Sequence, residues 1–190
     1  MAWTRTARIV FAGAVILVRG AQGALPPLAD DRTDASRVVL EYVDSLVVSA
    51  DPEDVQHIVR RILVRHPRDS RLWVRLAYLH EEARQPEAAE RAYRKALDIQ
   101  PDSYGTSFNF ARLLALEGRL DEALDLLAQQ LTAGVDDSDY WYLTGLVLLG
   151  SGLFEESVAA LERAIELAPD RAPIAAALED ARRWATNPGQ

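Results

Sequence analysis

A period of 34 residues runs through most of this chain and constrains its fold more than any other feature. The residues that recur at this period, or at twice it, are Pro67, Pro101 and Pro169, Trp73 and Trp141, Ala77 and Ala111, Ala89 and Ala123, and Gly118 and Gly152. The period divides the sequence without insertions into four units, at 36–69, 70–103, 104–137 and 138–171. Repeats of this length are typical of arrays in which each unit stacks on its neighbours and buries a shared core.

Each unit is predicted to form two helices. In the second unit, Leu72–Arg84 and Pro86–Ile99 both carry apolar residues at i, i+3, i+4 and i+7 spacing. Pro86 falls in the first turn of its helix, where the missing N–H costs nothing. Gly118 and Gly152 stand where the first helices of the third and fourth units should end, as a C-cap requires. No segment of the chain shows the alternating polar and apolar pattern of a strand.

These units resemble the tetratricopeptide repeat family, whose pattern has a large residue early in the first helix, a small residue one turn later, two alanines in the second helix and a closing proline. The residues at these five places are Val39, Trp73, Ser107 and Trp141; Val43, Ala77, Ala111 and Gly145; Val55, Ala89, Ala123 and Ser157; Ile62, Ala96, Gln130 and Ala164; and Pro67, Pro101, Val135 and Pro169. The second and fourth units match well. The third lacks the tryptophan and the proline, and the first has valine at two small positions, so the first is the least regular repeat.

The resemblance implies an all-α fold, a right-handed α-solenoid of helix-turn-helix repeats that binds other proteins in a concave groove. The groove residues that it implies are Arg71, Val74, Arg75, Tyr78, Phe108, Asn109, Arg112, Tyr142, Leu143 and Leu146, with Glu81, Ala115, Asp139 and Leu149 at neighbouring places. Aromatic and apolar residues between arginines suit a peptide or helix with apolar anchors and an acidic group. We expect some of these residues to pack against the neighbouring repeat instead.

Some members of the family grip a C-terminal carboxylate with lysine, arginine and asparagine residues in this groove. Only Asn109 stands at a matching place in this sequence. Leu40, Val74 and Asp139 contradict that pattern. The resemblance therefore does not favour a clamp of that type.

Residues 172–190 are predicted to form a capping helix and tail. Ile174, Ala177, Leu178, Ala181 and Trp184 are spaced along one face of a helix, and the residues between them are mostly polar. A solenoid needs such a cap, because its last repeat otherwise exposes a hydrophobic face.

Residues 1–23 are predicted to be a secretory signal. Arg5 and Arg8 precede ten apolar or small residues at 9–18, and small residues follow at a cleavage site after Gly23. This predicts a periplasmic or secreted protein. Two alternatives stay open: residues 9–18 are retained as an inner-membrane anchor, or they form a buried helix. Residues 24–35 are predicted to be an extended linker, because Pro26 and Pro27 disfavour helix.

Composition excludes several classes of function. The formal net charge of −8 argues against nucleic-acid binding, which needs a basic surface. There is no cysteine, and none of His57, His66 and His80 has a metal-binding neighbour at i+3 or i+4. His80 occupies an inward position, so we expect it to be packed in the core. The sequence therefore predicts no enzyme activity, no cofactor and no metal site.

Charge is unevenly distributed along the repeats. Residues 54–75 contain six arginines and two acids, a net charge of +4, whereas residues 116–170 contain twelve acids and two arginines, a net charge of −10. Three interpretations stay open: a basic end that meets an acidic partner, an end-to-end contact between copies, or two solvated faces.

Together these features predict a protein-binding scaffold or adaptor of the bacterial cell envelope, which takes a protein or peptide partner. A membrane contact is expected only if residues 9–18 are retained. The alternative is a membrane-tethered structural or assembly factor of an envelope complex. The sequence does not indicate the number of copies in the assembly.

Overall fold

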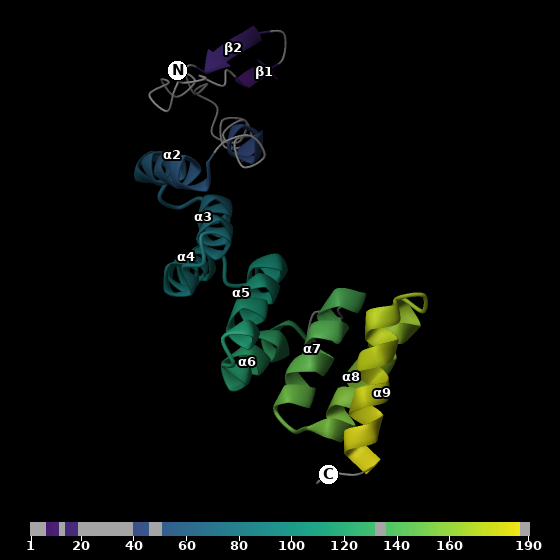
Figure 1. The fold of residues 1–190 in the computed structure, drawn as a ribbon. Coiled ribbons are helices and arrows are strands. Elements are labelled where there is room, and N and C mark those ends of the chain that lie inside the picture. Colours follow the sequence, from purple (N-terminus) through teal and green to yellow (C-terminus); the bar gives the residue numbers. More distant parts are fainter. Residues whose placement is uncertain (1–6, 12–13, 19–39, 46–50, 132–135, 187–190) are drawn as a thin grey trace. The chain divides into compact units, whose positions relative to one another are not determined.

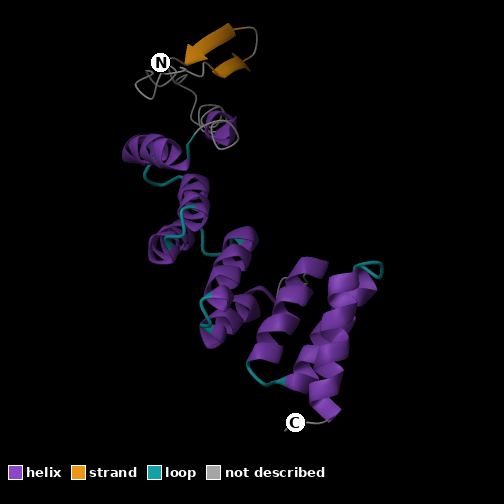
Figure 2. Ribbon diagram, viewed as in Figure 1, coloured by secondary structure: helices purple, strands orange, loops and turns teal. Residues whose placement is uncertain are grey.

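The structure is a computed structural model that describes residues 7–11, 14–18, 40–45, 51–131 and 136–186 (Figure 1). Within residues 40–186 the described elements are all helices joined by short turns, as Figure 2 shows. The chain divides into two compact units, Met1–Ile99 and Gln100–Gln190. From here on, the first and second units are these two parts of the chain, and the four 34-residue segments are called repeats.

In the first unit, residues 40–45 are helical and are followed by α2 (Pro52–Arg65), α3 (Ser70–Glu82) and α4 (Pro86–Ile99). The α3 helix packs along α4, and α2 packs against α3. The second helix of the second repeat therefore matches its predicted bounds residue for residue. The first helix begins and ends two residues earlier than predicted.

The first unit also contains a short hairpin near the amino terminus. Strands β1 (Ala7–Phe11) and β2 (Ala14–Val18) pair antiparallel, with Ala7 opposite Val18. The sequence did not predict this pairing, because a run that is apolar throughout has no alternation to distinguish a strand from a helix. The rest of the predicted signal and the linker at 24–35 lie outside the described residues. Among the residues that are described, no helix is long and apolar enough to span a bilayer.

The second unit contains α5 (Tyr104–Leu116), α6 (Leu120–Leu131), α7 (Ser138–Gly150), α8 (Phe154–Leu167) and α9 (Ala172–Thr186). Each helix packs against the next one along the chain. The third and fourth repeats thus form two successive helical hairpins, and α9 follows them.

Aspartates begin three of the helices, and two of them, Asp69 and Asp137, stand two repeat lengths apart. The side chains of Asp51, Asp69 and Asp137 each accept a hydrogen bond from the backbone N–H two residues later, at 2.9, 3.1 and 2.8 Å. These caps satisfy N–H groups that have no partner inside the helix. The cap at Asp69 explains why α3 begins before the first apolar residue of its pattern.

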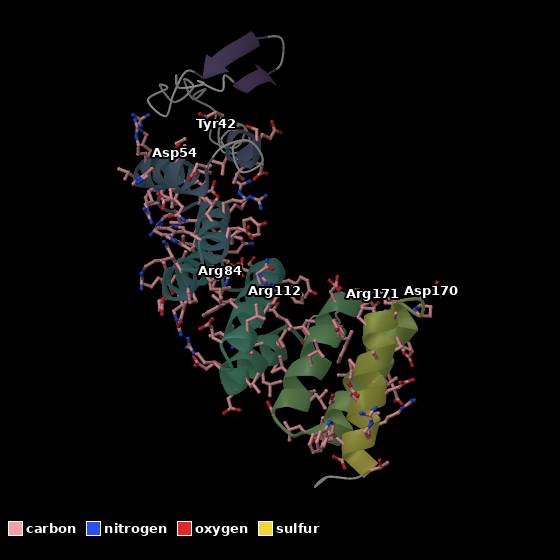
Figure 3. All side chains as sticks on the ribbon, in the orientation of Figure 1. Tyr42, Asp54, Arg84, Arg112, Asp170 and Arg171 are labelled. Atoms are coloured by element: carbon pink, nitrogen blue, oxygen red, sulfur yellow. The ribbon has the colours of Figure 1, made fainter. Side chains whose placement is uncertain are left out.

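The first helix of each of the last three repeats ends in a left-handed residue. The φ angles are 55° at Arg84, 75° at Gly118 and 76° at Gly152, at positions separated by one repeat length. The predicted C-cap role of the two glycines is confirmed, since glycine adopts this conformation without steric cost. Arg84, which Figure 3 labels, holds the same conformation with a full side chain.

The repeat period is visible in the burial of side chains. Every residue at the family's small position and at the first alanine position is buried: Val43, Ala77, Ala111 and Gly145; Val55, Ala89, Ala123 and Ser157. Small residues at these places let paired helices approach closely.

Two of the places where the third repeat departs from the family pattern lie together. Gln130 stands at an alanine position and Ser107 at a tryptophan position. The Gln130 Nε2 donates a hydrogen bond of 3.2 Å to the Ser107 Oγ, and both side chains are buried. The second and fourth repeats have tryptophan at the first of these places and alanine at the second. The third repeat has its small residue, Ser107, at the first place and its large polar residue, Gln130, at the second.

The α9 helix covers the end of the fourth repeat. Ile174, Ala177, Leu178 and Ala181 form a buried cluster with residues of α8 that include Leu161. Trp184 is partly exposed and stacks on Phe154, with ring centroids 6.0 Å apart.

Candidate functional site

A groove of about 420 Å³ opens in the second unit, and we call it the Tyr142 groove. It is lined by Phe108, Arg112, Ala115, Leu116, Leu120, Asp139, Tyr142, Leu143, Leu146, Val147 and Arg171. The first helices of the third and fourth repeats, α5 and α7, supply most of these residues. Their side chains recur every three or four residues and therefore lie on one face of each helix.

The lining is mostly apolar and open to solvent. The exposed fraction is 71% for Leu116 and 37% for Leu146, and the side chains of Phe108, Tyr142 and Leu143 are half-buried. Concave apolar surface that carries a few polar groups is the usual form of a ligand site. The groove has the chemistry to take apolar side chains of another chain.

Aromatic packing and a hydrogen bond hold one wall in place. Tyr104 stacks on Phe108, with ring centroids 6.2 Å apart and 25° between the ring planes. The Tyr104 hydroxyl donates a hydrogen bond of 2.9 Å to the Asp137 carboxylate, which also caps α7. Burial, followed by this carboxylate, raises the pKa of Tyr104 above its ordinary value.

Two arginines, Arg112 and Arg171, line the groove. Arg171 donates to the carboxylate of Asp139 and to the Ser138 Oγ, the latter at 3.3 Å, so its charge is largely compensated within the chain. Arg112 projects from α5, as Figure 3 shows, and its half-buried side chain adds a cation to the apolar wall. An acidic group beside an apolar anchor would complement this arrangement.

The structure brings together most of the residues that the sequence placed in this part of the groove. Phe108, Arg112, Tyr142, Leu143 and Leu146 line the same cavity, together with Ala115 and Asp139. Asn109 is half-buried on α5 and is not among the lining residues.

Four lining residues were not predicted from the sequence: Leu116, Leu120, Val147 and Arg171. Leu116 follows Arg112 by one helical turn, so helical spacing contained a signal for it. Leu120 and Arg171 lie outside the first helices of the repeats, which are the elements that the family resemblance places along the groove.

The four remaining predicted residues lie on α3 in the first unit. Arg71 pairs with Asp69, the capping residue of its own helix, at 3.0 Å. Arg75 pairs with Asp44 at 2.6 Å. Tyr78 is 42% exposed and Val74 is half-buried. Both arginines are therefore already matched by carboxylates.

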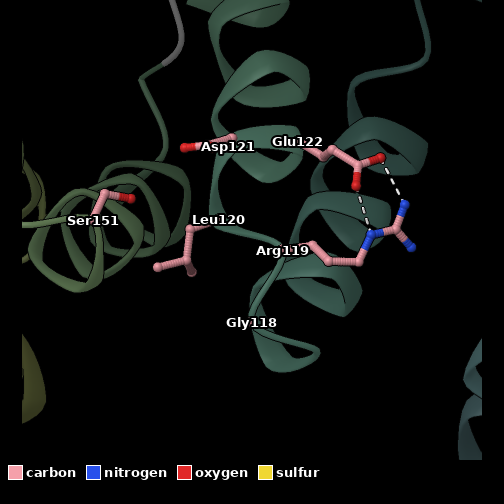
Figure 4. Close-up of a pocket in the computed structure, with 6 residues that line it drawn as sticks. All are labelled: Gly118, Arg119, Leu120, Asp121, Glu122 and Ser151. Atoms are coloured by element: carbon pink, nitrogen blue, oxygen red, sulfur yellow. Dashed lines mark hydrogen bonds and ion pairs between the residues drawn. The ribbon is translucent and has the colours of Figure 1, made fainter.

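A second cavity of the second unit, also of about 420 Å³, lies at the turn between α5 and α6 (Figure 4). The Arg119 guanidinium donates two hydrogen bonds of 2.6 Å to the Glu122 carboxylate. The cation in this cavity is thus neutralised, and the remaining lining residues are Gly118, Leu120, Asp121 and Ser151. It offers no chemistry that the Tyr142 groove lacks.

No group of histidine and acidic residues suited to a metal ion occurs among the described residues. His80 is buried, as expected, and is 5% exposed.

Comparisons with known proteins agree with this architecture. Family models described as "Tetratricopeptide repeat" match residues 43–104, 80–147 and 138–171, and none of them is a catalytic family. No curated protein matches the sequence.

Solved structures share the fold at low sequence identity. MamA 41-end from Desulfovibrio magneticus RS-1 superposes with a TM-score of 0.74 at 16% identity, over 84% of this chain and 88% of that one. Pseudomonas aeruginosa PilF has a TM-score of 0.72 at 19% identity, over 82% of this chain and 71% of that one. YrrB is described as a TPR protein with an unusual peptide-binding site. It has a TM-score of 0.65 at 23% identity, over 72% of this chain and 71% of that one.

These likenesses confirm the predicted all-α solenoid class. The three family matches together cover residues 43–171, more than half of the chain. Over these residues, the chain belongs to the tetratricopeptide repeat family.

Proposed function

We propose that this protein is a protein-binding module that holds a peptide or helix of its partner in the Tyr142 groove. The observation that carries the proposal is the open apolar cavity formed by α5 and α7, with Leu116 and Leu146 exposed in it. Exposed apolar surface in a concave site is costly unless a partner covers it. Two structural relatives support the same function: YrrB is described as having an unusual peptide-binding site, and the first TPR of RPAP3 is bound to an HSP90 peptide.

The ligand that fits best has two apolar anchors and an acidic group. The apolar side chains would pack on Phe108, Tyr142 and Leu146, and the acidic group would meet Arg112. In the first unit, we propose a separate contact surface that consists of Arg71, Val74, Arg75 and Tyr78 on α3. In that unit Tyr78 provides the exposed aromatic side chain.

A pair of matched substitutions tests the groove. Leu146→Asp puts a charge in the groove, and Leu153→Asp puts the same charge on a leucine of similar exposure, 41%, outside it. We expect partner capture after crosslinking in the host to be lost with Leu146→Asp or with Phe108→Ala plus Tyr142→Ala, and retained with Leu153→Asp. Circular dichroism checks that each variant is folded. If both aspartate variants capture the partner equally well, the Tyr142 groove is not the binding site.

We further propose that the protein acts in the bacterial cell envelope as an exported scaffold or adaptor. Arg5 and Arg8 before an apolar run at 9–18 support export. The alternative is a membrane-tethered assembly factor that keeps this run. N-terminal sequencing of protein from fractionated cells separates the two: a start after Gly23 supports the exported form, and an intact start at Met1 or Ala2 contradicts it.

A further inference from the structure

The first unit contains a different cavity, of about 620 Å³, which we call the Trp73 pocket. Its lining includes Arg60 from α2, Trp73, Leu76 and His80 from α3, and Arg91 and Lys95 from α4. The pocket uses a face of α3 that does not carry Arg71, Val74, Arg75 or Tyr78. It therefore plays no part in the proposed function of the Tyr142 groove.

Positive charge exceeds negative charge in this pocket. Arg94 also lines it but pairs with Glu90 at 2.7 Å, and Lys95 pairs with Asp98 at 3.3 Å. Arg60 contacts only neutral groups, the Gln56 Oε1 and the His80 Nε2, each at 3.4 Å. Within the described part of the chain, neither Arg60 nor Arg91 has a carboxylate partner.

His80 contacts Arg60, is acted on electrostatically by both arginines, and adds no negative charge. Its Nδ1 is 2.8 Å from the Gln85 Oε1, and its Nε2 faces the Arg60 guanidinium. Because arginine can only donate, Nε2 must accept, and Nδ1 must carry the proton. Burial lowers the pKa of His80, the hydrogen bond to Gln85 opposes this, and the charges of Arg60 and Arg91 lower it, so the net shift is downward. The imidazole is thus neutral and leaves both guanidinium charges uncompensated.

The other wall of the pocket is apolar. The Trp73 indole donates a hydrogen bond of 2.9 Å to the Pro67 carbonyl, which holds the ring in place, and Leu76 is buried beside it. A free inorganic anion would use the two arginines and leave this wall uncovered. A carboxylate attached to a chain with a neighbouring apolar side chain uses both walls.

We propose that the Trp73 pocket is a second binding site, which takes an acidic segment of a partner protein. In this arrangement Arg60 and Arg91 hold an aspartate or glutamate carboxylate, and an apolar side chain next to it packs on Trp73. Charge complementarity supports the assignment, because this basic cluster stands in a chain whose net charge is −8. Arginine also suits carboxylates, since its planar donors match their geometry.

The test is a selection of random heptapeptides on the full chain, followed by affinity measurements on variants. Arg60→Gln with Arg91→Gln removes the two pocket charges. Arg61→Gln with Arg65→Gln removes the same charge from exposed arginines of α2 that do not line the pocket. We expect peptides with an acid beside an apolar residue to lose about tenfold or more in affinity with the pocket variant. With the control variant we expect a loss of about twofold or less.

Three further measurements distinguish this site from the Tyr142 groove and from a site for a free anion. Bound peptide should raise the pKa of His80 in NMR titrations, because a nearby carboxylate favours the imidazolium. The same peptides should still bind the Leu146→Asp variant. The proposal for the Trp73 pocket and the proposal for the Tyr142 groove can therefore fail independently of each other. The proposal would be overturned in favour of a free anion by two results together: the apolar residue beside the acid adds nothing to the affinity of the peptide, and inorganic phosphate displaces the peptide completely.

Equal losses with both arginine pairs would also overturn it, because they would indicate only diffuse attraction. So would the absence of any selected peptide whose binding depends on Arg60 and Arg91. If the pocket variant abolished only self-association of the chain, the occupant would be a second copy and the proposal would be wrong.

Discussion

Gly145 of α7 and Leu161 of α8 approach so closely that no β-carbon fits between them. A β-carbon added at Gly145 would lie 2.5 Å from the Leu161 Cγ and 2.7 Å from its Cδ2. Leu161 is fully buried, and the Ser157 Oγ donates a hydrogen bond of 2.8 Å to the Gly145 carbonyl. Alanine occupies the same place in the second and third repeats, so the fourth repeat has a closer helix pair at this point.

The first prediction is that Gly145→Ala destabilises the second unit. Helix propensity favours alanine by about 1 kcal/mol, but forcing a methyl group into a packed core costs roughly 1–3 kcal/mol. The difference is a net loss of up to about 2 kcal/mol in the free energy of unfolding, measured by urea denaturation. Gly105→Ala is the matched control, because a β-carbon there meets nothing within 4 Å.

Gly105→Ala should be neutral or slightly stabilising. A second substitution, Leu161→Val, removes bulk from the other side of the contact and should cost less in the Gly145→Ala background than in the natural chain. Additive effects of the two substitutions would show that the contact does not limit the helix pair.

The second prediction concerns the left-handed residue that ends α3. Arg84 has a φ of 55°, whereas glycine holds this position in the next two repeats. A left-handed conformation costs a residue with a side chain roughly 1–2 kcal/mol. Arg84→Gly should therefore raise the free energy of unfolding by about 1 kcal/mol, and Arg84→Ala should not, since alanine keeps the steric cost.

Gly152→Ala provides the reciprocal measurement. Space is open around that position, so only the backbone conformation opposes the substitution. We expect a loss of about 1 kcal/mol. A gain with Arg84→Ala equal to that with Arg84→Gly would attribute the effect to charge and not to conformation.

The repeated parts of the fold were predictable because the same physical requirement recurs in each unit. Ala77 and Ala111 had to be small for the helices to pack, and Gly118 had to allow a left-handed turn. The 34-residue period shows such requirements directly, because the same residue type recurs at the same place in successive repeats. It does not report how one departure from the pattern compensates another, and so the hydrogen bond between Ser107 and Gln130 was not predicted.

The candidate groove was predictable only where one helix face determines it. Phe108, Tyr142 and Leu146 follow from their positions on the first helices. Leu120 enters from the next helix, and the distance between helices depends on packing that a single sequence does not contain. The pocket at Trp73 involves three helices and was not foreseen, although Arg60 belongs to the arginine-rich stretch recognised from the sequence.

The third prediction is that Ser107 and Gln130 are energetically coupled. Each is the other's only side-chain partner among the hydrogen bonds of the described residues. Gln130→Met or Ser107→Ala alone leaves one polar group buried without a partner, which costs roughly 1–3 kcal/mol. The double variant removes both groups and should be close to neutral.

A double-mutant cycle measured by urea denaturation checks this coupling. We expect an interaction energy of on the order of 1 kcal/mol or more between the two sites. If the double variant is as unstable as the sum of the single ones, the hydrogen bond contributes nothing beyond the packing of each side chain.

The last prediction is that His80 makes the stability of the first unit depend on pH. Its pKa is lowered in the folded protein by burial, with smaller contributions from Arg60 and Arg91 and an opposing one from the hydrogen bond to Gln85, so the unfolded chain binds the proton more tightly. The contribution to stability is therefore fully present above the unfolded pKa of about 6.5, and is lost as the pH falls toward the folded pKa. The loss cannot exceed about 1.4 kcal/mol per pH unit.

Variants with a side chain that does not titrate isolate this contribution from the acidic residues. We expect the free energy of unfolding of the natural chain to fall more steeply between pH 7.5 and pH 5.5 than that of His80→Gln or His80→Asn, by urea denaturation at each pH. The two variants differ in size and should differ in stability at pH 7.5, but their slopes with pH should agree. Parallel curves for all three proteins would show that protonation of His80 is not linked to unfolding. The neutral imidazole that contacts Arg60 would then have no energetic consequence.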